Sequence, residues 1–264
     1  MEKSIEVNLP INCVIVIQSL LPNESQTGKQ LYDDIIKRRC SQHELNSGIV
    51  NVKNKDEFLN LASTLLEKLQ PESAKPLLHF EVHGCEEGLQ LASGEIVGWD
   101  EVGSCTRSIN EYLGNTLFIS LATCKGAHIL KSIDPTIRAP FWGILGPKQD
   151  ISHEEVVNDF NGFYDELLNS FDLQKAIDIL NDFNPSAVYV WMTSEFVFDE
   201  FLVPMIKKKL ETKIERFKRL FPDSKNAYPL MNRKERRQQL KSNIKQHSRE
   251  KFVKDCRNTF LFLK

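Results

Sequence analysis

The sequence lacks any long apolar run, and this absence excludes a membrane-spanning protein. No stretch approaches the roughly 20 consecutive apolar residues that a membrane helix needs. The most apolar early stretch, residues 11–21, is interrupted by polar side chains and is not followed by a small-residue cleavage site. We therefore interpret it as a first strand rather than as a signal peptide. With 41% apolar residues in 264, the chain has enough material for a sizeable core.

Paired cysteine motifs are also missing. Six cysteines are scattered through the chain, and no two of them form a C-x-x-C pair. This spacing argues against a disulfide framework and against a zinc ribbon, and it predicts a reduced, cytoplasmic setting. A metal site built from His83, Cys85 and Cys105 would lack a fourth ligand, so we expect no metal.

Charge is distributed unevenly along the chain, although the net charge is only -2. Residues 1–204 hold 15 Lys+Arg against 30 Asp+Glu, whereas residues 205–264 hold 19 against 6. From residue 195 onward the pattern is helical only. The sequence therefore predicts an acidic domain over residues 1–195 and a basic, α-helical C-terminal extension over residues 196–264.

Strand and helix patterns alternate through the acidic part. Short β-forming runs occupy residues 11–17, 47–52, 76–83, 117–124, 141–146 and 187–192. Helical spacing occupies residues 30–39, 56–69, 100–113, 152–168 and 173–183, with a short helix expected after Cys124. Residues 88–97 predict a small hairpin, with its turn at Ser93-Gly94, at the rim of the sheet. This alternation predicts an α/β fold with a mostly parallel sheet and helices on both faces.

Helix starts are indicated by capping residues. Asn54 or Asp56 is expected to begin the helix over residues 56–69, and Asp100 is expected to cap the next helix. Ser152 and Glu155 form a capping-box pattern at the start of the helix over residues 152–168.

Two of the expected strands end at a reactive side chain close to a glycine. One ends at His83-Gly84, and the other ends at Cys124, two residues before Gly126. The carboxyl ends of parallel strands meet at one edge of a sheet, so an imidazole and a thiol are expected side by side. Such a pair forms a nucleophile and its proton-transfer partner. His79 is a competing histidine on the same strand face, and Glu81 is a candidate to orient His83.

The order of these pieces resembles the caspase-like cysteine peptidases, most closely their prokaryotic members and the CHAT branch. The resemblance covers about residues 8–195 and depends on His83-Gly84, the hairpin, the strand ending at Cys124, and the strand-helix unit over residues 141–168. It implies that Cys124 is the nucleophile, that His83 transfers protons, and that the backbone N–H groups of Gly84 and Cys124 form an oxyanion hole. It also implies a protein substrate, no cofactor, activation by a partner or signal, and a role in bacterial antiviral defence.

The residues that would select the substrate favour different kinds of side chain. Relatives that cut after Arg or Lys often carry an acidic residue two positions before the nucleophile, and Ala122 stands there in this chain. Ala122 alone favours a small or apolar side chain, Asp150 favours a basic one, and Lys148 favours an acidic one. These three residues are therefore the expected substrate-pocket candidates, and they leave the preference open.

The basic extension has several interpretations. It could pack on the acidic body, bind a protein partner, or bind nucleic acid, although it has few of the interleaved aromatic residues that single-strand binding uses. Self-cleavage within residues 207–209 or 233–237 is a further idea. Two rivals to a peptidase follow: a catalytically inactive caspase-like scaffold, and a nucleic-acid-binding protein.

Overall fold

The computed structural model describes residues 11–69, 74–148, 150–183, 189–210, 213–246 and 249–263. The described residues form two compact units. The first unit lies within Met1–Asp134 and Ala139–Thr193, and the second lies within Pro135–Arg138 and Ser194–Lys264. No described helix has the length and apolar composition to cross a membrane.

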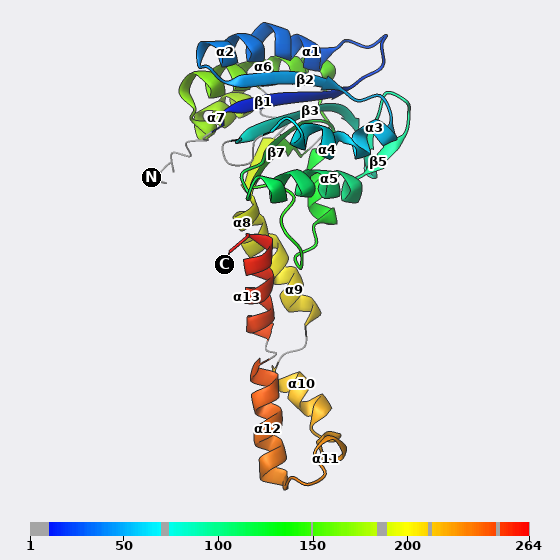
Figure 1. The fold of residues 1–264 in the computed structure, drawn as a ribbon, viewed down its shortest axis with the longest axis vertical. Helices are drawn as coiled ribbons and strands as arrows, with labels where there is room; N and C mark the ends of the chain where they lie inside the picture. The colour runs from blue at the N-terminus through cyan, green and yellow to red at the C-terminus, as the bar shows by residue number, and fades with distance from the viewer. Residues whose placement is uncertain are drawn as a thin grey trace. The chain divides into compact units, whose positions relative to one another are not determined.

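A central sheet organises the first unit (Figure 1), and its main strand order is β2-β1-β3-β6-β7-β8. The strands are β1 (Cys13–Ser19), β2 (Asn46–Asn51), β3 (Pro76–Gly84), β6 (Phe118–Ala122), β7 (Gly143–Pro147) and β8 (Tyr189–Thr193). All neighbours are parallel except β8, which is antiparallel to β7. Every residue of β1, β6 and β7 is buried, as expected for strands covered on both faces.

One face of the sheet is covered by helices from the two ends of the first unit's sequence (Figure 1). They are α1 (Thr27–Leu31), the π-helical turn η1 (Tyr32–Ile36), α2 (Lys37–Gln42), α6 (His153–Ser170) and α7 (Leu173–Phe183). The predicted capping box opens α6, because Ser152 Oγ accepts from Glu155 N–H while the Glu155 carboxylate accepts from Ser152 N–H. Phe160 and Phe163 of α6 are fully buried in the core on this side.

The opposite face is covered by α3 (Lys55–Leu59), α4 (Leu61–Leu66), α5 (Trp99–Tyr112) and the 3₁₀ helix η2 (Gly126–Ser132) (Figure 1). Asn54 caps α3 by accepting from Glu57 N–H at 2.9 Å. The expectation that Asp100 caps α5 is wrong: Gly98 occupies the cap position, and the Glu101 carboxylate accepts from its N–H at 2.9 Å. A carboxylate three residues into the helix can satisfy this amide, so no side chain is needed at the cap itself.

The expected hairpin forms at the end of β3. Its strands, β4 (Gly88–Gln90) and β5 (Ile96–Gly98), pair in antiparallel fashion, and β4 also pairs with β3. Gly94 adopts φ +86° in the connecting turn, a conformation that favours glycine. The prediction of an α/β fold with a mostly parallel sheet between helical layers is therefore confirmed.

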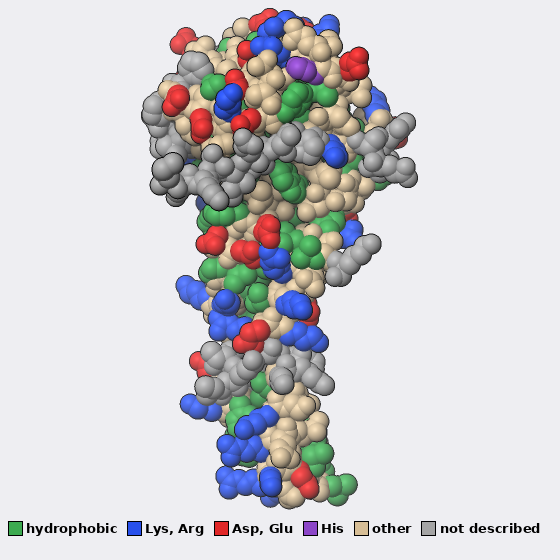
Figure 2. All heavy atoms as spheres, turned by 90° about the vertical axis from the view of Figure 1, so that its left-hand side faces the viewer, with side chains coloured by type: hydrophobic (Ala, Val, Ile, Leu, Met, Phe, Trp, Pro, Cys, Tyr) green, Lys and Arg blue, Asp and Glu red, His purple; other side chains and the backbone are tan. Residues whose placement is uncertain are grey.

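The regular secondary structure described in the second unit is all helical. It contains α8 (Ser194–Phe196), η3 (Val197–Leu202), α9 (Val203–Lys209), α10 (Lys213–Leu220), α11 (Ser224–Ala227), α12 (Arg233–Gln246) and α13 (Arg249–Phe260). Phe198 packs against Phe260 with ring centroids 5.4 Å apart, and Arg257 pairs with Asp199. The face drawn in Figure 2 carries many Lys and Arg side chains over these helices.

A bidentate ion pair between Arg39 and Asp165 joins α2 to α6 on the surface of the first unit. Arg39 donates from Nε to Asp165 Oδ1 at 2.7 Å and from a terminal nitrogen to Oδ2 at 2.8 Å. The hydrogen bond with Arg39 lowers the pKa of the Asp165 carboxyl below its usual value. A lowered carboxyl pKa stabilises the folded state above the usual pKa, and this stabilisation is lost as the pH falls through the lowered one.

We expect a double-mutant cycle of Arg39→Gln and Asp165→Asn to give a coupling free energy of about 0.3–1 kcal/mol at neutral pH, because the pair is partly exposed. Urea unfolding followed by tryptophan fluorescence measures it, since all three tryptophans, Trp99, Trp142 and Trp191, lie in the first unit. The coupling should shrink below about pH 4. A coupling that is equal at acid and neutral pH would contradict this account.

Candidate functional site

The two predicted reactive residues lie at one edge of the sheet. β3 and β6 are parallel neighbours, and their last paired residues are Glu81 and Ala122. His83 follows Glu81 by two residues, and Cys124 follows Ala122 by two residues. Both line one pocket of about 80 Å³. The structure thus brings the imidazole and the thiol to a shared crevice, as the strand-end pattern predicts.

Gly84 presses directly on the backbone of Cys124. A Cβ placed on Gly84 would lie 1.9 Å from the Cys124 carbonyl oxygen and 2.5 Å from Thr123 Oγ1. Both distances are far inside van der Waals contact, so only glycine allows this approach. The glycine after the histidine is therefore a packing requirement of the site.

Two backbone amides are available near the thiol. The Cys85 N–H donates to Gly88 O at 2.9 Å, which makes these residues a hydrogen-bonded pair of the antiparallel ladder. Hydrogen-bonded pairs alternate with non-bonded pairs, so the Gly84 N–H is directed away from β4. In the described part of the chain, the Cys124 N–H has no backbone acceptor. The predicted oxyanion-hole donors, Gly84 and Cys124, are thus adjacent residues with N–H groups that the β3–β4 ladder and the turns leave unused.

His83 is oriented by a carboxylate that the sequence did not indicate. Its Nε2 lies 3.2 Å from both oxygens of Glu24, in the loop after β1, and its side chain is 56% exposed. An ionised carboxylate only accepts hydrogen bonds, so Nε2 carries a proton and Nδ1 is the nitrogen left for proton exchange. The interpretation that Glu81 orients His83 is wrong, because the polar partners of the Glu81 carboxylate are Thr27 Oγ1 and His79 Nε2.

The competing histidine, His79, is a buried structural residue. Its side chain is fully buried, and its ring packs edge-on against Phe160 and Tyr164 at 4.9 and 5.2 Å between centroids. Nε2 lies 3.1 Å from Glu81 Oε2, and Nδ1 lies 3.2 Å from Ser120 Oγ. A substrate has no access to this ring.

The six cysteines differ in burial, and burial decides which thiols are reactive. Burial raises the pKa of Cys13, Cys40 and Cys105 to about 11. Cys256 is also buried, whereas Cys85 and Cys124 are half-buried. The Cys124 Sγ lies 3.6 Å from the Ile151 carbonyl oxygen, and Cys85 Sγ lies 3.4 Å from Gly88 O in the hairpin. Cys85 and Cys124 are therefore the most exposed of the six cysteines.

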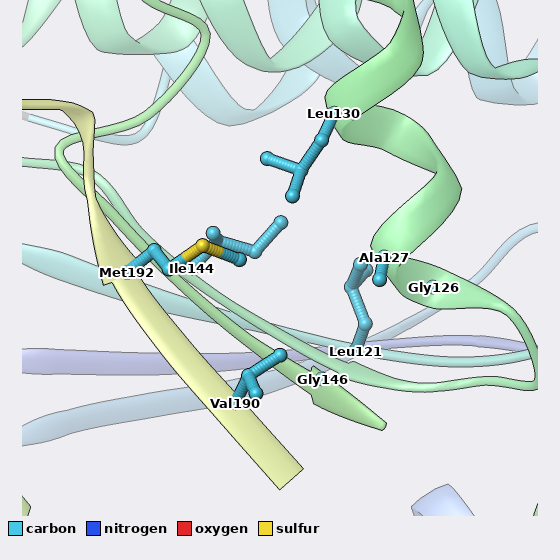
Figure 3. Close-up of a pocket in the computed structure, with 8 residues that line it drawn as sticks. All are labelled: Leu121, Gly126, Ala127, Leu130, Ile144, Gly146, Val190 and Met192. Carbon is cyan, nitrogen blue, oxygen red and sulfur yellow. The ribbon is translucent and has the colours of Figure 1, made fainter. Parts of the chain in front are cut away.

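The segment after Cys124 is anchored by apolar contacts on the other face of the sheet. Lys125 adopts a left-handed conformation with φ 57°, and η2 begins at the next residue. In Figure 3, Leu130 of η2 points toward Ile144 and Met192 of the sheet. This apolar pocket of about 10 Å³ has no charged lining residue, so it serves packing and holds the loop that carries Cys124.

The substrate-pocket candidates are placed differently from one another. Ala122 lines the pocket together with Cys124. Lys148 and Asp150 are exposed and are not among the lining residues. Instead, the wall includes Thr27 and Glu81, which sequence reasoning did not assign to the pocket. In the described residues, no group of three or more His, Cys, Asp and Glu side chains is arranged to hold a metal ion.

The positions of Glu24 and Thr27 in the sequence could have indicated that they lie near the site. Both follow the first strand, and the carboxyl end of every parallel strand lies at the same edge of the sheet as His83 and Cys124. A polar residue in that loop was therefore a candidate for the site. Which of the loop residues faces the pocket depends on the loop conformation, which no sequence pattern indicates.

We expect Gly84→Ala to destabilise the first unit by about 1–3 kcal/mol, because the new methyl group overlaps the Cys124 backbone. Gly48→Ala on β2 is the matched control, since a Cβ there meets nothing within 4 Å and should change stability by less than about 0.5 kcal/mol. Urea unfolding of both variants makes the comparison. Equal stability of the two variants would refute the close contact.

Alkylation with iodoacetamide at about pH 8, followed by peptide mass analysis, should modify Cys124 and Cys85 well before the other cysteines. With a pKa near 11, about one thiol in a thousand is ionised at that pH. The unfolded chain in urea is the control, and all six cysteines should react there at similar rates. Rapid labelling of Cys105 in the folded protein would contradict the burial pattern.

Comparison with known proteins finds no matching family model and no matching curated protein. The caspase-like resemblance therefore stays a prediction based on the order of the motifs. The placement of His83 and Cys124 in one pocket does not depend on that resemblance. These side chains are the basis for the chemistry proposed below.

Proposed function

We propose that this protein is a cysteine endopeptidase of the caspase-like type, with Cys124 as the nucleophile and His83 as its proton-transfer partner. The observation that carries the proposal is that these two residues line one pocket while Gly84 packs against the Cys124 backbone. A nucleophile and an exposed imidazole in one pocket, with backbone amides beside it, are the minimum set for acyl transfer.

In the proposed reaction, the Cys124 sulfur attacks the carbonyl carbon of a peptide bond and forms a tetrahedral intermediate. The N–H groups of Gly84 and Cys124 donate to the developing oxyanion. His83 Nδ1 takes the proton of the Cys124 thiol and passes it to the leaving amine, while the Glu24 carboxylate holds Nε2–H and fixes the ring orientation. Water then hydrolyses the thioester, and the free thiol and the carboxylic acid are released.

The Cys124 thiol makes a hydrogen bond in this structure that it must lose before it can attack a substrate. The Cys124 Sγ lies 3.6 Å from the Ile151 carbonyl oxygen, which accepts a hydrogen bond from the thiol. Attack on a substrate requires loss of this contact. This resting contact supports the expectation, from the family resemblance, that a partner or signal activates the protein.

Several wider aspects belong to the same proposal. The resemblance suggests a bacterial defence role and no cofactor, and the scattered cysteines suggest a cytoplasmic location. The basic extension over residues 196–264 as a separate functional module stays a prediction, as do its packing on the acidic body, its binding of a protein or nucleic acid, and self-cleavage within it. The inactive scaffold remains the main rival to an active peptidase.

We expect Cys124→Ala to abolish cleavage of an unstructured protein such as casein, whereas Cys85→Ala keeps it, since Cys85 lies in the turn between β3 and β4 and does not line the pocket. His83→Gln should lower kcat/KM by about 100-fold or more, and Glu24→Gln by less. Gel and mass analysis of the products measures this. Activity that survives Cys124→Ala would exclude the proposal.

A further inference from the structure

Given the proposed peptidase function, we infer that the pocket beside Cys124 accepts a lysine or arginine side chain, whose charge is recognised by Glu81. Glu81 lines the pocket that also contains His83 and Cys124. The residue on the N-terminal side of the cleaved bond would therefore be basic.

The position of Glu81 follows from the register of the sheet. Glu81 of β3 is the direct partner of Ala122 of β6, so both side chains emerge on the same face. Ala122 has only a methyl group, which leaves room for the neighbouring carboxylate. The acidic group missing at position 122 is thus present one strand away, at the same height in the sheet.

Glu81 is held in place by two polar side chains and keeps capacity to bind a cation. Its side chain is 5% exposed, and its polar partners are the Thr27 hydroxyl at 2.5 Å and His79 Nε2 at 3.1 Å. In the described part of the chain, no Lys or Arg forms an ion pair with Glu81. The two oxygens of a carboxylate can accept about four hydrogen bonds, so acceptor sites remain for a cationic head group that enters the pocket.

The remaining pocket walls suit the stem of a long cationic side chain. Leu20, Val82, Ile151 and Val156 supply apolar surface, and Thr123 supplies a buried hydroxyl that has no hydrogen-bond partner in the described structure. None of the lining residues is a Lys or an Arg. Methylene groups can pack along such walls while the charged head reaches the carboxylate. An acidic substrate side chain would meet repulsion from Glu81 and no compensating cation.

The test uses four tripeptide chloromethyl ketones that differ only in the terminal residue: arginine, lysine, leucine or aspartate. Each is added to the full chain, and the rate of alkylation at Cys124 is measured by peptide mass analysis. Arginine and lysine ketones should react at least about tenfold faster than the leucine ketone, with aspartate slowest. Glu81→Gln should remove most of this preference. Glu67→Gln is the matched control, because it removes an exposed carboxylate on the other face of the sheet and should keep the preference.

The outcomes separate the two proposals. Faster labelling by leucine or aspartate ketones, or equal rates for all four, would overturn the role of Glu81 while leaving Cys124 as a nucleophile. If no ketone labels Cys124 in preference to Cys85, the peptidase function falls and the basic specificity falls with it. The wild-type series decides the preference even if Glu81→Gln does not fold. A Glu81→Gln variant that folds, as judged by tryptophan fluorescence, and keeps the full preference would show that Glu81 has only a structural role.

Discussion

The close approach of Gly84 to the backbone of Cys124 is the constraint on which the site depends. The parallel pairing of β3 with β6 brings the two strand ends together, and the missing side chain at Gly84 lets them meet. The contact brings the residue that precedes Gly84, His83, to the same pocket as Cys124. The pairing of Gly84 with Leu89 directs the Gly84 N–H away from β4, and η2 holds the far side of the Cys124 loop through apolar contacts.

Strand β3 combines structural and chemical functions through its two-residue period. His79, Glu81 and His83 share one face of the strand, but burial decreases along it. His79 is enclosed by aromatic side chains, Glu81 lies between the core and the pocket, and His83 is exposed at the edge. The core histidine orients the pocket carboxylate, so the polar network inside the protein prepares the surface of the site. A fully apolar strand would have packed equally well but would have carried no charge to the pocket.

The fold was largely predictable because its signals are local. Apolar periodicity indicated the order of strands and helices, the Ser152 capping box indicated the start of α6, and the Ser93-Gly94 pair indicated the hairpin turn. The errors arose where a choice depends on contacts rather than on sequence. Asp100 looked like a cap, but the Glu101 carboxylate reached the Gly98 amide and made that cap unnecessary. The inclusion of residues 135–138 in the second unit had no local signal, because it depends on contacts such as Arg138 over the Phe262 ring at 5.0 Å.

The sequence by itself determined the alternating α/β pattern, the charge division and the placement of His83 and Cys124 at one edge of the sheet, because the period of each strand and its terminal residues depend on consecutive positions. Only the tertiary structure decided which carboxylate serves which histidine. Glu24 is 59 residues from His83 in the chain, whereas Glu81 is two residues away and contacts another ring. Along a strand, residues two apart share a face but are directed by their neighbours across the sheet, so side-chain partners depend on packing between strands and not on proximity in sequence.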